Sequence, residues 1–208
     1  MSIIQSQTLT NMKSLTLILA FVAITVADKI PDFIVPGQCP PVDTEGLWRQ
    51  QQPNHSKYAG VWYQHAITNN PYQPNVKCNR IQYDFDGHGF DAKTNGITAE
   101  GNLLRHNGKI YPNPLGVPVL SIDYEGMFAS PYTVLDTDYE NYSCIYSCID
   151  YNHNYYSDFA FIFTRSPSLS DQHLRKCQKA FSDINVDISR FSRTEQGSSC
   201  PYDALKNL

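Results

Sequence analysis

From residue 61 to residue 164, short β-favouring runs alternate with turn residues at intervals of roughly ten residues. Eight such runs predict an antiparallel up-and-down barrel, or else a sandwich of two sheets, and the pattern alone leaves both open. The runs are 61–68, 78–85, 89–94, 97–105, 109–111 with 117–124, 132–139, 142–150 and 156–164.

Turn-forming residues separate these runs. Asp-Gly and Asn-Gly dipeptides favour tight hairpins, because both residue types tolerate a positive φ. The predicted turns are Asp86-Gly87, Asn95-Gly96, Asn107-Gly108, Pro112-Asn113-Pro114 and Glu140-Asn141.

The pattern changes to a helical period after the last run. Ser168 or Ser170 can cap a helix in which Leu174, Cys177 and Phe181 form one apolar stripe. Such a stripe predicts one helix packed against the outside of a barrel or sandwich. The tail from residue 191 to 208 is expected to be tied back to the body, and residues 28–57 read as an irregular arm.

Strand alternation also assigns the two faces of the sheet. If Trp62 points into a barrel, Gln64 and Ala66 point in with it. If the cysteines of the run 142–150 point outward to covering segments, Ile145, Ser147 and Ile149 point inward.

Residues 1–27 read as a secretory signal peptide. Lys13 precedes an apolar run from Leu15 to Val26 that ends in small residues, with cleavage expected after Ala27. Met12 could be the true start. We therefore expect residues 28–208 to form a single secreted, extracellular domain. They hold no other segment long enough to span a membrane.

All six cysteines follow the signal segment, and an even number in a secreted chain predicts three disulfides. Fifteen pairings are possible. Cys144 cannot bridge Cys148 if both share a strand, because four residues of strand span about 13 Å whereas bridged Cα atoms sit about 4.4–6.8 Å apart. Their equal parity puts both on one face, so each must reach a separate covering segment.

The remaining composition argues against several functions. The formal net charge is −4 with no basic cluster, which disfavours nucleic acid and anionic membranes. No nucleophile or metal motif is present, and Asp84–Gly87 lacks the later Glu of a calcium loop. We expect neither an enzyme nor a metal site. Asn54 and Asn141 begin glycosylation sequons.

Three separated elements resemble the lipocalin family: Gly60 and Trp62 opening the first barrel run, Thr137-Asp138-Tyr139, and Arg165 after the last run. The resemblance implies an eight-stranded up-and-down antiparallel barrel with one C-terminal α-helix outside. In such a barrel the glycine allows close backbone approach, and the arginine lies across the indole as a cation–π pair at the closed end.

Longer segments resemble the crustacyanin subunits of that family, above all the C1-like class. The resemblance implies a barrel that binds the carotenoid astaxanthin non-covalently, shifts its colour for carapace pigmentation, and forms a heterodimer with an A2-like subunit that assembles further. The segments include 28–33, 58–64, 68–73, 111–114, 120–124, 137–139, 146–151 and 197–203.

The same resemblance implies particular residue roles. It implies disulfides Cys39–Cys148, Cys78–Cys200 and Cys144–Cys177. It also implies ligand contacts from Phe33, Tyr83, Ser121, Tyr124 and Phe128, the two tyrosines holding polar atoms near one end ring. This chain has Val119 where relatives have a histidine and Ile81 where they have an asparagine, so two hydrogen-bonding groups near the ligand are replaced.

Three alternatives compete with this hypothesis. One is a monomeric transport lipocalin for another small apolar ligand, such as a retinoid, bilin or fatty acid. The second is an enzyme-like or inhibitor lipocalin, which would show a reactive cysteine or a clustered His/Asp site. The third is an interaction protein whose barrel is filled by its own side chains.

Overall fold

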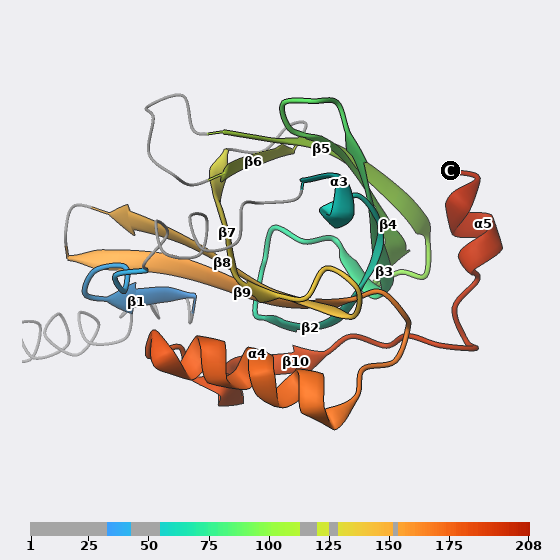
Figure 1. Cartoon of the computed structure of the whole chain (residues 1–208). Helices are drawn as coiled ribbons and strands as arrows, with labels where there is room; N and C mark the ends of the chain where they lie inside the picture. Colours follow the sequence, from blue (N-terminus) through green and yellow to red (C-terminus); the bar gives the residue numbers. More distant parts are fainter. Residues whose placement is uncertain (1–32, 43–54, 113–119, 125–128, 152–153) are drawn as a thin grey trace, which may run out of the picture. The chain divides into compact units, whose positions relative to one another are not determined.

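Eight antiparallel strands, consecutive in the chain, close into a barrel where β9 pairs with β2 (Figure 1). The computed structural model describes residues 33–42, 55–112, 120–124, 129–151 and 154–208. The predicted lipocalin barrel is thereby confirmed, and the sandwich is excluded. The barrel strands are β2 (Gly60–Thr68), β3 (Asn75–Phe85), β4 (Phe90–Thr98), β5 (Leu103–Pro112), β6 (Leu120–Tyr124), β7 (Ser130–Thr137), β8 (Tyr142–Tyr151) and β9 (Tyr155–Thr164).

Within the described ranges, five shorter elements accompany the barrel, and together with the longer helix α4 they cover parts of it. They are β1 (Ile34–Pro36), α3 (His55–Tyr58), η1 (Ile188–Arg190), β10 (Phe191–Arg193) and α5 (Tyr202–Lys206). The expected signal peptide at 1–27 lies outside the described residues, so cleavage after Ala27 stays a prediction.

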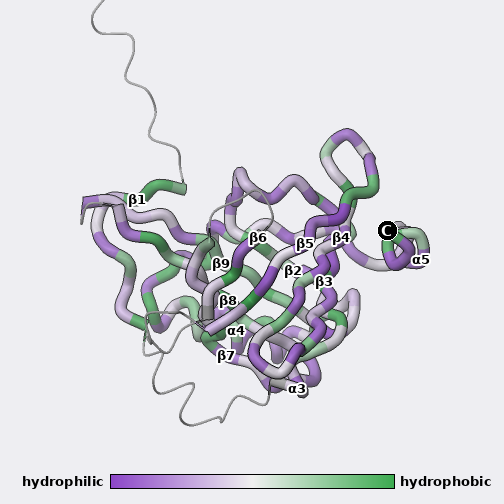
Figure 2. The backbone as a smooth tube through the Cα atoms, turned by 90° about the horizontal axis from the view of Figure 1, so that it is seen from above, coloured by the Kyte–Doolittle hydropathy of each residue, from purple (hydrophilic) through white to green (hydrophobic). Residues whose placement is uncertain are grey.

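The strands of the barrel mix hydrophobic and hydrophilic residues instead of forming long apolar runs (Figure 2). This is the pattern of a sheet with one face toward a core and the other toward solvent or a cover. Among the described helices, none combines the length and the apolar character needed to cross a membrane.

Two of the predicted hairpin turns are wrong. The pairs Asn95-Gly96 and Asn107-Gly108 lie inside β4 and β5, and the turn between these strands follows Thr98 instead. Gly96 is needed for close approach, since a Cβ there would come within 2.8 Å of the Asn75 Cβ. The Asn95 side chain donates to the carbonyl of Leu205 over 2.7 Å. Tertiary contacts thus explain both residues of the first pair.

The Asp86-Gly87 turn is confirmed. The Asp86 carboxylate accepts hydrogen bonds from the backbone N–H groups of His88 and Gly89, each over 2.8 Å. Gly87 has φ +97°, a conformation that an L side chain rarely adopts. The β3–β4 hairpin therefore follows from local turn chemistry, unlike the two wrong assignments.

A β-bulge between Gln64 and Ala66 changes the direction of side chains along β2. Gln64 pairs with Phe163, and both line the barrel interior. Ala66 pairs with Ile162, and both belong to the apolar cluster under helix α4. The expectation that Ala66 points into the barrel is therefore wrong, because the extra residue of a bulge reverses the alternation beyond it.

The C-terminal segment fills the seam where β2 leaves β3. The two strands pair only from Gly60 to Tyr63, after which β10 takes the free edge of β2. The Gln196 amide then donates to the carbonyls of both Gln64 (2.9 Å) and Asn79 (2.7 Å). One side chain thus bridges the two separated strands.

Helix α4 (Asp171–Asp183) packs on the outer face of the barrel as predicted. Ser170 is the N-cap, and its hydroxyl accepts from the backbone of His173 over 3.3 Å. Cys177 and Phe181 are fully buried, whereas Leu174 is only partly buried.

The three disulfides have the pairing that the resemblance implies, and no described cysteine is free. A cross-link of this kind contributes on the order of 2–4 kcal/mol, mainly by restricting the unfolded chain. Each joins a strand to a covering segment: Cys39–Cys148 to the N-terminal arm, Cys144–Cys177 to α4, and Cys78–Cys200 to the tail.

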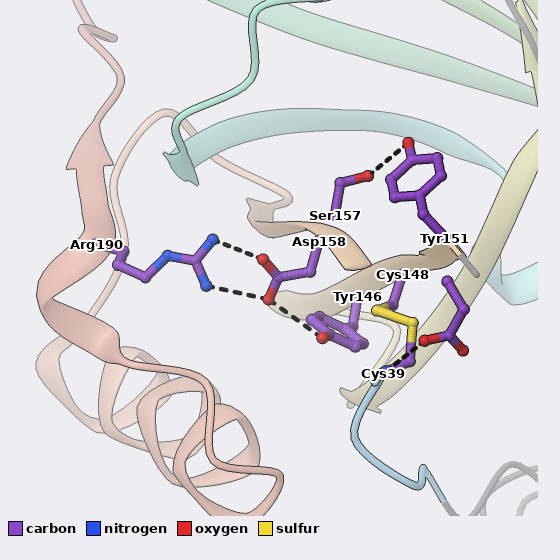
Figure 3. The surroundings of a disulfide bond; sticks show 8 residues. Cys39, Tyr146, Cys148, Tyr151, Ser157, Asp158 and Arg190 are labelled. Carbon is purple, nitrogen blue, oxygen red and sulfur yellow. Dashed lines mark hydrogen bonds and ion pairs between the residues drawn. A yellow bond between two sulfur atoms is a disulfide. The ribbon is translucent and has the colours of Figure 1, made fainter. Parts of the chain in front are cut away.

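A buried ion pair holds the turn after α4 against the sheet (Figure 3). Asp158 on β9 is only 1% exposed and accepts from Arg190 over 2.6 and 3.1 Å. The Tyr146 hydroxyl on β8 also donates to this carboxylate over 3.1 Å. Several donors around one buried carboxylate are the condition under which its desolvation is offset.

Arg165 closes the end of the barrel at which β2 begins. Its guanidinium lies 3.8 Å from the centroid of the Trp62 ring. The same group donates to the carbonyls of Val61 and Tyr139, each over 3.0 Å, and of Lys57 over 2.6 Å. The cation–π pair implied by the lipocalin resemblance is present, and hydrogen bonds to three separate segments accompany it.

Replacing Arg165 with Ala should lower the free energy of unfolding by roughly 2–4 kcal/mol, because the stack and several carbonyl partners are lost together. Urea unfolding followed by fluorescence would measure the change. Arg165→Lys keeps the charge but loses the planar fork and should recover less than half of the loss. Equal midpoints for wild type and Arg165→Ala would show that the closed end does not depend on this residue.

Candidate functional site

The interior of the barrel holds a cavity of about 120 Å³. Its wall is mostly apolar, with Ile81, Ile122, Ile145, Phe161 and Phe163 pointing inward from four strands. No Asp, Glu, Lys or Arg is among the described residues that line it. An apolar, uncharged wall with a few polar groups suits a neutral and largely hydrophobic ligand.

A cluster of aromatic residues forms the floor of the cavity. Tyr58, from α3, packs its ring 5.1 Å from Trp62 and 5.6 Å from Tyr83, measured between centroids. The indole N–H of Trp62 donates to the backbone carbonyl of Tyr58 over 2.9 Å. The short helix α3 therefore plugs this end of the barrel, as Figure 1 shows.

A chain of hydroxyl groups runs through this floor. The Tyr132 hydroxyl lies 2.9 Å from that of Tyr83 and 3.0 Å from that of Tyr58. Tyr58 in turn lies 2.8 Å from the Ser143 hydroxyl. Burial raises the pKa of Tyr58 to about 12 and raises the pKa of Tyr132 well above its usual value. The floor is therefore neutral, and its hydroxyls satisfy one another.

Two of the predicted ligand residues line the cavity and a third lies at its rim. Tyr83 and Ile81 are 1% and 2% exposed and belong to the wall. Phe33 precedes β1, and its ring centroid lies 6.1 Å from that of Tyr72 and 6.4 Å from that of Phe159. Tyr72 and Phe159 both line the cavity, so Phe33 extends the wall outward.

The other predicted ligand residues are not placed in the cavity. Ser121 is buried on β6 but is not among the described lining residues, whereas its neighbour Ile122 is. Val119 and Phe128, and the side chain of Tyr124, lie outside the described part of the structure. Their roles stay predictions.

Several lining residues were not predicted. Tyr132 belongs to the floor, and Asn79 and His106 lie on β3 and β5. Asn79 Oδ1, His106 Nε2 and the Ser147 hydroxyl are buried and have no hydrogen-bond partner among the described residues. Ser147 was expected to point inward from strand parity alone. The same parity, continued along β3 from Ile81, would have found Asn79.

The described residues contain no group of three His, Cys, Asp or Glu side chains that could hold a metal ion. The cysteines of the described chain are in disulfides. The described residues that line the cavity offer apolar burial, aromatic packing and a few neutral hydrogen-bonding groups.

The buried tyrosines should make the protein sensitive to alkali. The folded state keeps Tyr132 neutral above its usual pKa, so stability is present below about pH 10 and falls as the pH rises further. Each such tyrosine contributes a slope of about 1.4 kcal/mol per pH unit. Tyr132→Phe should flatten the dependence of the unfolding free energy between pH 9.5 and 11 by about that amount.

Tyr155→Phe, which removes a hydroxyl from a residue 41% exposed, is the matched control and should leave the slope unchanged. If Tyr132→Phe and wild type lose stability in parallel, the floor does not hold Tyr132 neutral.

The lipocalin / cytosolic fatty-acid binding protein family profile matches residues 59–198. The crustacyanin-C1 and crustacyanin-A1 subunits of Homarus gammarus are 61% and 60% identical over 181 residues, which is 87% of this chain and all of theirs.

A solved structure of a crustacyanin subunit has a similar fold. Lobster apocrustacyanin A1 superposes with a TM-score of 0.84 at 60% identity, covering 86% of this chain and all of the other. The chain therefore belongs to the lipocalin / cytosolic fatty-acid binding protein family, and within it to the crustacyanin-like lipocalins.

Proposed function

We propose that this protein binds astaxanthin in its barrel, as a crustacyanin subunit that tunes the colour of the carotenoid for pigmentation. The single observation that carries the proposal is the uncharged cavity with an aromatic floor, in a chain 61% identical to a crustacyanin-C1 subunit along that subunit's whole length. The bound carotenoid is the chromophore, and the protein supplies burial and hydrogen bonds without covalent chemistry.

The size of the cavity indicates how such a ligand would sit. Pockets that enclose a whole drug-sized ligand measure about 300–1,000 Å³, whereas this one holds about 120 Å³. A carotenoid would therefore insert one end ring, and its polyene would leave past the aromatic rim at Phe33 and Tyr72. A protruding apolar chain needs a cover. An A2-like subunit that shares the carotenoids with this chain would provide one, and the pair could assemble further.

The cysteine chemistry is consistent with an extracellular site of action. Three disulfides persist in oxidising compartments, and the apolar run before Ala27 would direct secretion. Asn141 is exposed between β7 and β8, so its sequon would be accessible to glycosylation.

A second candidate is a monomeric transport lipocalin for a smaller apolar ligand. The observation in its favour is again the cavity volume, which suits one ring system better than a long polyene. The visible spectrum of protein isolated from its source separates the two, because a retinoid, a bilin and a blue carotenoid complex absorb in different ranges.

We expect the oxidised mature chain, mixed with astaxanthin and an A2-like crustacyanin subunit, to form a heterodimer whose visible absorbance is shifted to the red of free astaxanthin. Size exclusion with absorbance detection measures both effects. The chain without the A2-like subunit is the control and should give a smaller shift. Elution of the protein without pigment in the mixture that contains the A2-like subunit would overturn the proposal.

Val119→His should move the absorbance maximum of the heterodimer further to the red. The change would restore a hydrogen-bond donor near the ligand's keto oxygen, where donors help to stabilise the polarised polyene. Affinity should change little, because burial of the polyene at about 25 cal/mol per Å² dominates it. An unchanged maximum together with much tighter binding would mean that ring packing, and not this hydrogen bond, sets the colour.

A further inference from the structure

Three polar groups in the wall of the cavity point to a selective site. Asn79 on β3, His106 on β5 and Ser147 on β8 all line the cavity, and we refer to them as the polar belt. In each, one polar atom is shielded from solvent and has no hydrogen-bond partner among the described residues: Asn79 Oδ1, His106 Nε2 and Ser147 Oγ.

Burial makes these groups unusual. Asn79 is 2% and Ser147 5% exposed, and apolar side chains such as Ile81 and Ile145 share the same wall. Buried polar groups in folded proteins are paired in the great majority of cases, because an unmade hydrogen bond leaves their desolvation uncompensated. These three groups, and Asn75, which also lines the cavity with a buried Nδ2 and Oδ1 that lack partners among the described residues, indicate that the cavity's occupant has polar atoms that face them.

The belt contrasts with the floor below it. In the floor, the Tyr132 hydroxyl lies 3.0 Å from that of Tyr58 and 2.9 Å from that of Tyr83, so these hydroxyls are hydrogen-bond partners. Across the sheet, Ile81 pairs with Thr94 and Thr94 pairs with His106, so the belt histidine lies in the same row as Ile81. The wall thus carries a hydrogen-bonding group in that row, although Ile81 itself has none.

The chemistry of Asn79 narrows the occupant. Its amide N–H already donates to Gln64 Oε1 over 3.0 Å, so Oδ1 is the atom that remains, and a carbonyl oxygen can only accept. The complementary ligand atom must therefore be a donor. With no acidic side chain among the described lining residues, a neutral hydroxyl fits better than an ammonium group. Ser147 and a neutral His106 can each donate to an oxygen or accept from a hydroxyl.

We propose that the polar belt selects carotenoids whose buried end ring bears a hydroxyl group. Asn79 accepts the hydroxyl hydrogen, and Ser147 and His106 donate to the hydroxyl oxygen. The inference rests on the proposed carotenoid function and adds to it a specificity for hydroxylated rings, with the residues that read them. A ring with ketones alone leaves Asn79 Oδ1 unpaired and binds more weakly.

The test compares two ligands that differ only in hydroxylation. Astaxanthin carries a hydroxyl beside each keto group, and canthaxanthin carries the keto groups alone. Dissociation constants are measured by quenching of tryptophan fluorescence, using the oxidised mature chain with an A2-like crustacyanin subunit. The wild type should prefer astaxanthin by about tenfold, the effect of one well-formed buried hydrogen bond.

Ser147→Ala and His106→Leu should each reduce this preference to about threefold or less, with canthaxanthin affinity nearly unchanged. His106→Gln keeps a polar group of similar reach and should retain most of the preference. His88→Leu, at an exposed position of the β3–β4 turn, is the matched control and should behave as wild type. Near-ultraviolet circular dichroism of each variant shows whether the fold is kept.

The outcomes separate the two proposals. Equal wild-type affinity for both carotenoids, or a preference that survives in both Ser147→Ala and His106→Leu, overturns the belt's role and leaves carotenoid binding standing. The belt would then hold water only. If neither carotenoid quenches the wild type, carotenoid binding itself is wrong, and the ring specificity falls with it.

Discussion

Closure of the sheet between β2 and β9 is the constraint on which the rest of the structure depends. To reach β9, strand β2 parts from β3 after Tyr63 and passes through a bulge before Ala66. Gln64 before the bulge faces the cavity, and Ala66 beyond it faces helix α4. The bulge therefore separates the part of β2 that lines the cavity from the part that packs beneath helix α4.

The same closure explains why the C-terminal segment packs against the barrel. A gap between β2 and β3 would expose backbone groups, and the tail occupies it with β10 and Gln196, held by the Cys78–Cys200 bridge. The closed end is fixed by Arg165 and the aromatic floor. A rigid floor and a rim of aromatic rings are consistent with a ligand that is held at one end and projects at the other.

Much of this fold could be predicted from the sequence. The short β-favouring runs, the Asp86 turn and the stripe of Cys177 and Phe181 are local patterns, and local patterns persist in the structure. Asn95-Gly96 was misread because its strand position depends on Asn75 and Leu205, which are distant in sequence. The bulge in β2 leaves no sign in the alternation of polar and apolar residues, and disulfide partners could be named only through the family resemblance.

The site shows the same division between local and distant information. The resemblance identified Tyr83 and Ile81. It could not show which neighbouring polar atoms lack a hydrogen-bond partner, because that depends on every element that packs around them. The floor and the belt contain similar residue types, but the floor's hydroxyls are bonded to one another and the belt's Asn79, His106 and Ser147 each keep an unpaired atom. Such a difference makes the floor a structural plug and makes the belt the part of the wall at which one ligand can be distinguished from another.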